Sequence, residues 1–354
     1  MSLIFADGFD SYAAAGASVA GLMRENGWEW SGSQLYATST VPGSAGKSVR
    51  LYAGELNRQI DPVDEAIVGF SYMYTFGSND VVCAFRYNPG YDGSTIQDLM
   101  KVKINTLGGM SVEIVGATGT ADYTSDVGIL FPLVWAFIEV RYKPHGSAGT
   151  IRVKVNGVEV ITLSGVTRGT LRPNVITDIA LPHSVGTEYS GLNYAYYDNF
   201  YLCGKAGLAP FNDFLGEIAI IRPLLTSDAA PNAWTPSSGT SHIDLMNDSV
   251  ADDDTSYLEH NVVTGRELFG IGTLPSNVSA VLAVGLKLRA KKSAVGARNL
   301  AAVAVLGANT LVSATQISGA AYKFFPTWME LDPAGAAWSV ANAESTKVGF
   351  EVAV

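Results

Sequence analysis

The sequence predicts an all-β protein, and three observations carry this prediction. Apolar and polar residues alternate with period two over most of the chain, the alternating segments end at Gly, Asn, Asp or Pro, and a helical period is almost absent. The clearest segment is 149–163, where Asn156 and Gly157 supply the two positive-φ residues of a type I′ hairpin turn. Together these features are typical of antiparallel sheets.

The first 205 residues contain about ten expected strands, which is enough for a large two-sheet sandwich. Their ranges are 48–52, 66–76, 81–87, 99–104, 110–115, 136–142, both arms of 149–163, 176–181 and 196–203. The single expected helix covers 13–23, an Ala-rich segment that Gly16 and Gly21 interrupt.

The character of the sequence changes after Cys203, which places a domain boundary near residue 205. Residues 206–275 are expected to be an extended linker with one strand at 214–221, because this part is irregular and contains several Pro residues. The acidic run at 252–254 in this linker is expected to be a solvated loop. Strands return at 280–290, 299–306, 323–331 and 346–354, so residues 276–354 are expected to form a small β-sandwich-like domain.

Composition excludes several classes of protein. The 354 residues carry a formal net charge of −10, which argues against nucleic acid as the main partner. The apolar runs are much shorter than the ~20 residues of a membrane helix, and the first residues do not resemble a secretion signal, so a cytoplasmic origin is expected. Cys83 and Cys203 lie in expected strands, where buried free thiols are favoured over a disulfide.

No short motif indicates an enzyme. Retaining glucanases place two carboxylates about 5–5.5 Å apart on one strand face, whereas Glu217 stands alone here and Asp61, Asp64 and Glu65 flank a proline. Gly-x-Ser-x-Gly, His-Glu-x-x-His, Cys-x-x-Cys and Walker motifs are absent from the sequence. The expectation is therefore that the protein has no enzymatic activity, and a glycosidase is kept as the third hypothesis.

Several segments have counterparts in a known family. Residues 3–12 are similar to its first strand, 135–140 and 149–157 to a strand and hairpin, 196–202 to its closing strand, and 211–218, 234–239 and 252–257 to its linker. With these segments the chain resembles tailed-bacteriophage virion proteins that carry a concanavalin-A-like (laminin-G-like) lectin/glucanase jelly roll. The resemblance implies such a jelly roll over residues 1–205.

The resemblance also implies a function. It suggests a structural protein of a tailed-phage particle, either a capsid decoration protein or a tail-attached protein, which is assembled in the host cytoplasm. Its partners would be other virion subunits and further copies of itself. It would act through subunit contacts and surface display, without inserting into a membrane.

A structural Ca²⁺ between the first and last strands is the one cofactor that the resemblance implies. Its oxygen ligands would come from Asp7, Asp10, Asp198 and Asn199. The simpler alternative is that Asp7 and Asp10 make turn hydrogen bonds around Gly8 while Asp198 faces solvent.

The alternative function is a carbohydrate-binding adhesin that recognises host surface glycans. Lectin-type sites stack sugar rings on exposed aromatic faces, and the candidate residues are Tyr189, Tyr194, Tyr91 and Trp30. Packing in the core or at its rim is the simpler interpretation of such aromatic side chains.

Overall fold

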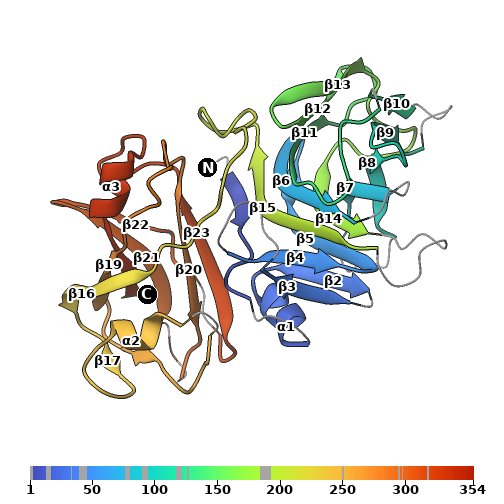
Figure 1. Ribbon diagram of the computed structural model, residues 1–354. Coiled ribbons are helices and arrows are strands. Elements are labelled where there is room, and N and C mark those ends of the chain that lie inside the picture. Colours follow the sequence, from blue (N-terminus) through green and yellow to red (C-terminus); the bar gives the residue numbers. More distant parts are fainter. Residues whose placement is uncertain are drawn as a thin grey trace. The chain divides into compact units, whose positions relative to one another are not determined.

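The chain divides into two compact units, Met1–Ile221 and Arg222–Val354. The computed structural model describes residues 3–12, 17–32, 34–39, 46–75, 80–89, 95–116, 122–125, 127–183, 193–248, 251–293, 296, 298–316 and 319–354. Regular structure in these residues is mostly β, as the sequence predicts (Figure 1). None of the described helices is long and apolar enough to cross a membrane.

The first unit contains two antiparallel sheets that enclose one core. The eight-stranded sheet has the order β13-β12-β11-β6-β15-β4-β3, and β1 also pairs with β15. Its strands are β1 (Leu3–Asp7), β3 (Leu35–Thr38), β4 (Ser48–Leu51), β6 (Ala66–Tyr74), β11 (Ala136–Lys143), β12 (Gly149–Val155), β13 (Val158–Gly165) and β15 (Ala195–Gly204).

The seven-stranded sheet has the order β10-β9-β8-β7-β14-β5-β2. Its strands are β2 (Trp28–Gly32), β5 (Gly54–Val63), β7 (Asp80–Tyr87), β8 (Gln97–Ile104), β9 (Met110–Ile114), β10 (Asp122–Thr124) and β14 (Ile176–His183). These two sheets form the jelly-roll sandwich that the sequence predicts.

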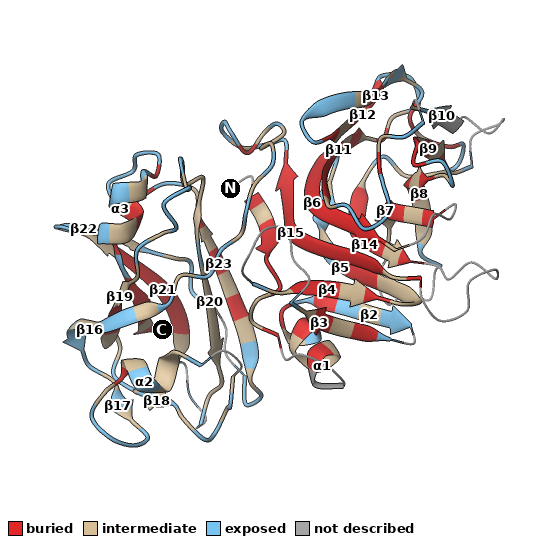
Figure 2. Ribbon diagram, viewed as in Figure 1, coloured by how far each residue is buried: buried red, intermediate tan, exposed pale blue. Residues whose placement is uncertain are grey.

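Burial along the strands explains why the alternation is clear in some segments and absent in others. In β12 every second residue is buried, starting with Gly149, and the residues between them are half-exposed. In the central strands β6 and β15 every residue is buried (Figure 2), so both faces are mostly apolar, with Ser71, Asp198 and Asn199 as buried polar exceptions. Cys83 and Cys203 are both buried, and neither is part of a disulfide among the described residues.

The predicted hairpin turn is confirmed. Asn156 and Gly157 have φ angles of 49° and 79°, and Val155 pairs with Val158 on either side of them. The Asn156 side chain also accepts a hydrogen bond from the backbone N–H of Phe137 at 2.8 Å, which ties the turn to the neighbouring strand β11.

Two predictions for the first unit need correction. The helix α1 covers Ala17–Glu25 rather than 13–23, and residues 13–16 lie outside the described residues. Residues 214–221 form no strand, because their backbone N–H groups bind side chains of the eight-stranded sheet. Gly216 N donates to Glu139 Oε1 at 2.9 Å, and Ile220 N donates to Asn199 Oδ1 at 2.8 Å.

The second unit is built around a five-stranded sheet of order β16-β19-β24-β21-β22. The strands are β16 (Leu225–Asn232), β19 (Arg266–Ile271), β21 (Asn299–Leu306), β22 (Asn309–Val312) and β24 (Lys347–Ala353). Two-stranded sheets are formed by β17 (Thr235–Pro236) with β18 (Leu258–Glu259), and by β20 (Val284–Ala290) with β23 (Lys323–Met329). Two short helices, α2 (Ile243–Met246) and α3 (Val340–Ser345), complete the unit.

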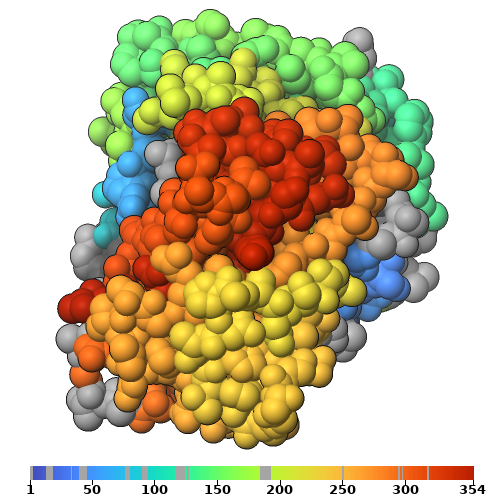
Figure 3. Space-filling view, turned by 90° about the vertical axis from the view of Figure 1, so that its left-hand side faces the viewer, coloured from blue at the N-terminus to red at the C-terminus, as the bar shows by residue number. Residues whose placement is uncertain are grey.

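The prediction that 206–275 is an extended linker is also wrong, since β16 and β19 belong to this five-stranded sheet. A buried group fixes the segment between them. One oxygen of the buried Glu267 carboxylate accepts a hydrogen bond from Trp234 N at 3.1 Å. The other oxygen lies 2.7 Å from His242 Nδ1. Residues 222–248 (yellow) and the C-terminal residues (red) are both visible on the face of this unit that Figure 3 shows.

Candidate functional site

The outer face of the seven-stranded sheet, the side that points away from the sandwich core, carries the candidate site. Leu56, Phe85 and Ile179 are fully buried in the core. Because successive side chains of a strand point to opposite faces, the neighbouring residues Glu55 and Arg86 point outward.

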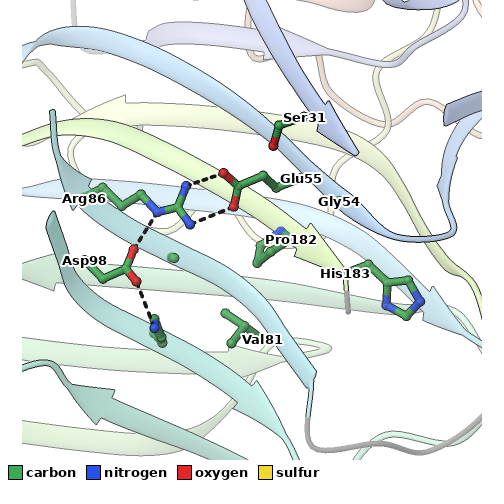
Figure 4. Close-up of a pocket in the computed structure, with 10 residues that line it drawn as sticks. Ser31, Gly54, Glu55, Val81, Arg86, Asp98, Pro182 and His183 are labelled. Atoms are coloured by element: carbon green, nitrogen blue, oxygen red, sulfur yellow. Dashed lines mark hydrogen bonds and ion pairs between the residues drawn. The ribbon is translucent and has the colours of Figure 1, made fainter. Parts of the chain in front are cut away.

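Arg86 lies at the centre of a network of ion pairs on this face (Figure 4). Its Nη1 and Nη2 atoms donate to the two oxygens of Glu55 at 2.9 and 2.7 Å, and its Nε donates to Asp98 Oδ1 at 2.6 Å. The other oxygen of Asp98 lies 2.8 Å from Lys101 Nζ. Asn57 supports the network by donating to Glu55 Oε1 at 3.0 Å.

The sheet order explains how Arg86 reaches Glu55. Strand β14 lies between β7 and β5, and it places Ala180 and Pro182 opposite Asn57 and Glu55. Both side chains are short. The long Arg86 side chain can therefore extend over β14 to form a two-bond contact with the Glu55 carboxylate.

A pocket of about 310 Å³ lies above this network. Its wall includes Ser31, Gly54 and Pro182, and its charged side chains come from Glu55, Arg86, Asp98 and Lys101. The Glu55, Asp98 and Lys101 side chains are 24%, 25% and 26% exposed, so a ligand can reach them. Figure 4 places His183, the remaining titratable residue of the pocket wall, apart from the ion pairs.

The carboxyl groups near Arg86 differ in protonation. Burial opposes the ionisation of Glu55 and Asp98. Hydrogen bonds outweigh this effect and lower the pKa of both carboxyl groups: Arg86 donates to Glu55, and Lys101 and Arg86 donate to Asp98. Asp178, which pairs with Arg86 across β14 and β7, behaves in the opposite way. Burial raises its pKa to about 7, and the Glu55 charge adds to the rise. Near neutral pH ionised carboxylates on the pocket wall therefore lie near a buried carboxyl group, that of Asp178, which is partly protonated and does not line the pocket.

His183 is buried at the end of β14 and is neutral at pH 7. Burial lowers its pKa even though Asp80 lies 3.5 Å from its Nδ1 atom. Its Nε2 atom lies 3.2 Å from the carbonyl oxygen of Asn193, so that nitrogen carries the proton and donates.

Only two of the four predicted sugar-stacking residues lie in the described part of the chain, and they belong to different sheets. Tyr91 and Tyr189 lie outside the described residues. Trp30 is half-buried and packs against the core of the sandwich. Tyr194 immediately precedes β15 of the eight-stranded sheet, where its ring centroid is 5.6 Å from that of Tyr52.

The four predicted calcium ligands have different surroundings. The Asp7 carboxylate accepts hydrogen bonds from Phe9 N, Asn26 Nδ2 and Trp28 Nε1, each at 3.0 Å, so the predicted turn interaction is present. Asp10 Oδ1 accepts from Lys47 N at 2.6 Å. These donors occupy oxygens that a calcium ion would need.

Asp198 is 5% exposed rather than facing solvent, and burial raises its pKa to about 8. The amide oxygen of Asn199 accepts from Ile220 N. Within the part of the chain that the structure describes, no three His, Cys, Asp or Glu side chains are grouped to hold a metal ion. The four residues do not fit Ca²⁺ as one set, and the calcium site stays a prediction.

The sequence did not predict the residues of the Arg86 network as site residues. A local signal did exist in β5, where Glu55, Asn57 and Gln59 alternate with buried or half-buried residues on one face. Arg86 and Asp98 gave no such signal, because their partners come from other strands and only the sheet order reveals them.

No family model matches this chain, and no curated protein matches it. Among solved structures, a double mutant of alginate lyase Aly36B in complex with alginate tetrasaccharide is 16% identical, over 57% of this chain and 97% of the lyase, with a TM-score of 0.42. A Bacillus licheniformis β-glucanase is 14% identical over 58% of this chain and 99% of its own, with a TM-score of 0.37. The Ca²⁺/Man3GlcNAc-bound VIP36 exoplasmic/lumenal domain is 9% identical over 56% and 89%, with a TM-score of 0.34.

These structures correct one expectation. The missing motifs suggested that the protein is not an enzyme, but the similar structures include alginate lyases and a β-glucanase, so that expectation is wrong. They are jelly-roll proteins that act on or bind glycans, and the likeness concerns the fold. None of the three is a virion protein, so the virion assignment stays a prediction.

Proposed function

We propose that the first unit binds a polysaccharide on the outer face of its seven-stranded sheet, in the pocket beside Arg86. The observation that carries this proposal is the partly exposed network of Glu55, Arg86, Asp98 and Lys101 on the pocket wall. The sequence also suggested a carbohydrate-binding protein as the alternative function. The proposal keeps that function but assigns it to different residues.

The chemistry of the network suits sugar hydroxyl groups. A hydroxyl donates and accepts at the same atom, and the network offers carboxylate acceptors beside guanidinium and ammonium donors. Because each side chain is held by ion pairs, little conformational entropy is lost when a ligand binds. The pocket volume of about 310 Å³ is at the lower limit of small-molecule sites, which suits one or two sugar rings of a longer chain.

Affinity gel electrophoresis of the full chain with alginate, β-glucan and mannan tests the proposal. We expect at least one polysaccharide to retard the wild-type chain and Glu55→Gln to weaken this retardation by roughly tenfold, since one acceptor of the network is lost. The matched control is Glu159→Gln, because Glu159 also pairs with an arginine but lies in β13 of the other sheet. Retardation by none of the three polysaccharides, or equal retardation of the Glu55→Gln and control variants, would contradict the proposal.

A second candidate function is glycan cleavage at the same face. The observation that favours it is the separation of carboxyl pKa values, because acid–base catalysis needs one protonated and one ionised group. Glu55 would be the base and Asp178 the acid, which requires the buried Asp178 carboxyl group, 1% exposed here, to become accessible when substrate binds. Product release from the retarding polysaccharide, lost in Asp178→Asn while retardation persists, would support cleavage, and a wild-type chain that releases no product would contradict it.

The place of the protein on a tailed-phage particle, among other virion subunits, is a separate proposal that rests on the resemblance of its segments. In that setting the pocket would meet glycans of the host surface. Mass spectrometry of purified particles tests it, and a chain found only in the host cytoplasm would contradict it.

A further inference from the structure

We propose a second ligand site, at Arg50 on the outer face of the eight-stranded sheet, that binds the carboxylate of an acidic sugar. It lies on the other sheet from the Arg86 pocket and shares no residue with it. The inference therefore does not depend on the proposed function.

Arg50 is placed on this face by the local alternation of β4. Its neighbours Val49 and Leu51 are fully buried in the core, so Arg50 points away from it. Strand pairing aligns it with Tyr36 on β3 and with Tyr196 on β15, and both tyrosines point outward for the same reason. The three residues form one row across the edge of the sheet.

Two tyrosine rings contact the guanidinium group of Arg50. Its central carbon lies 4.5 Å from the ring centroid of Tyr36 and 4.6 Å from that of Tyr194. Both distances are within the range of cation–π contacts. A cation–π contact uses none of the N–H donors of the guanidinium, so these donors remain for another partner.

No acidic partner for Arg50 exists in the described part of the chain. Its guanidinium forms no ion pair or hydrogen bond with any described residue, and its Nε atom is buried without an acceptor. By contrast, Arg86, Arg141 and Arg152 each bind at least one carboxylate. A half-buried cation with unused N–H donors is a ready site for an anion, because a planar carboxylate forms two parallel hydrogen bonds with it.

The surroundings of Arg50 favour an anion carried on a sugar ring. The Tyr194 ring lies 5.6 Å from that of Tyr52 and 6.5 Å from that of Tyr196, and Trp135 lies 6.3 Å from Tyr196. Sugar rings present C–H groups that pack on aromatic faces. A uronic acid combines such a ring with the carboxylate that Arg50 requires.

Binding of tetragalacturonate to the ¹⁵N-labelled full chain tests the site, and the matched probe is its methyl ester, which has the same rings without the charge. We expect tetragalacturonate to shift the Arg50 Nε–H resonance and the methyl ester to bind at least tenfold more weakly. Arg50→Gln should weaken binding at least tenfold. Arg152→Gln, at an arginine of the same sheet whose side chain is 34% exposed, and Glu55→Gln, in the Arg86 pocket, should leave it unchanged.

The remaining outcomes are decisive as well. Arg50→Lys keeps the charge but loses the planar pair of donors, so it should bind several-fold more weakly even if Arg50→Gln does not fold. Equal binding of the ester would overturn the carboxylate assignment, and sulfate that binds as tightly as tetragalacturonate would overturn the sugar assignment. No shift of the Arg50 resonance with tetragalacturonate, or unchanged affinity in both Arg50 variants, would overturn the site.

Discussion

Asp178 and Arg86 pair across strands β14 and β7, yet the guanidinium of Arg86 binds Glu55 and Asp98 instead. Asp178 is 1% exposed, and its Oδ1 atom has no hydrogen-bond partner among the described residues. Burial without a paired donor keeps its carboxyl group protonated to higher pH than usual, with a pKa of about 7. This arrangement has consequences for stability as well as for chemistry.

Asp178→Asn should stabilise the folded protein at high pH. The folded pKa of about 7 lies above the ordinary value of 3.8, so the stability that neutral Asp178 provides is complete below about pH 4 and is lost as the pH rises through 7. At pH 8 the variant should exceed the wild type by roughly 2–4 kcal/mol. Urea unfolding at pH 4 and pH 8 measures the difference.

The control for this prediction is Glu159→Gln. Hydrogen bonds from Thr162 and Arg152 lower the pKa of Glu159, so removing its charge should not stabilise the protein at pH 8. A stability gain in Asp178→Asn that is equal at both pH values would show that the buried charge is not its cause.

Arg86→Leu should destabilise the first unit by about 1–3 kcal/mol, because Glu55 then loses its main donor and Asp98 keeps only Lys101, while both carboxylates remain partly buried. Thermal unfolding measures the effect. Arg152→Leu is the comparison, since its ion pair with Glu159 is one-third exposed on both sides and should contribute less than about 1 kcal/mol. Equal losses would show that the Arg86 network adds no stability beyond an exposed pair.

Asp7→Ala should be strongly destabilising, by about 3–5 kcal/mol. The Asp7 carboxylate is buried, and its loss leaves Trp28 Nε1 without its acceptor and removes one of the two acceptors of Asn26 Nδ2, beside the aromatic cluster of Phe5, Trp28 and Phe200. Chemical denaturation of the full chain measures the loss. If chelation of Ca²⁺ in the wild type reproduces the same loss, the role of Asp7 is metal binding rather than hydrogen bonding.

Two glycine substitutions should change the stability of the protein in opposite directions. Gly157→Ala adds a methyl group to open space but at a φ of 79°, so we expect a loss of about 1 kcal/mol from backbone strain. Gly21→Ala also meets open space but lies inside α1, where alanine favours the helix by about 0.5–1 kcal/mol. Thermal unfolding of both variants measures the two stability changes. A loss in both would show that added volume, and not the backbone angle, is decisive.

The second unit shows where sequence patterns fail. Strand β16 has the sequence LTSDAAPN, which lacks alternation and contains a proline, yet it pairs with β19 at the edge of the five-stranded sheet. An edge strand needs few apolar residues because only one neighbour pairs with it and much of it stays exposed. The same irregular composition made this segment resemble a linker.

The sequence by itself determined the all-β class and the hairpin at Asn156 and Gly157, because period-two alternation and turn chemistry act between neighbours along the chain. Only the tertiary structure decided which polar residues meet. Glu55, Arg86 and Asp98 lie on three strands, and the order β8-β7-β14-β5 brings them together. The same holds for Arg50 beside Tyr36 and Tyr194, since pairing between distant strands, which no local pattern encodes, sets both contacts.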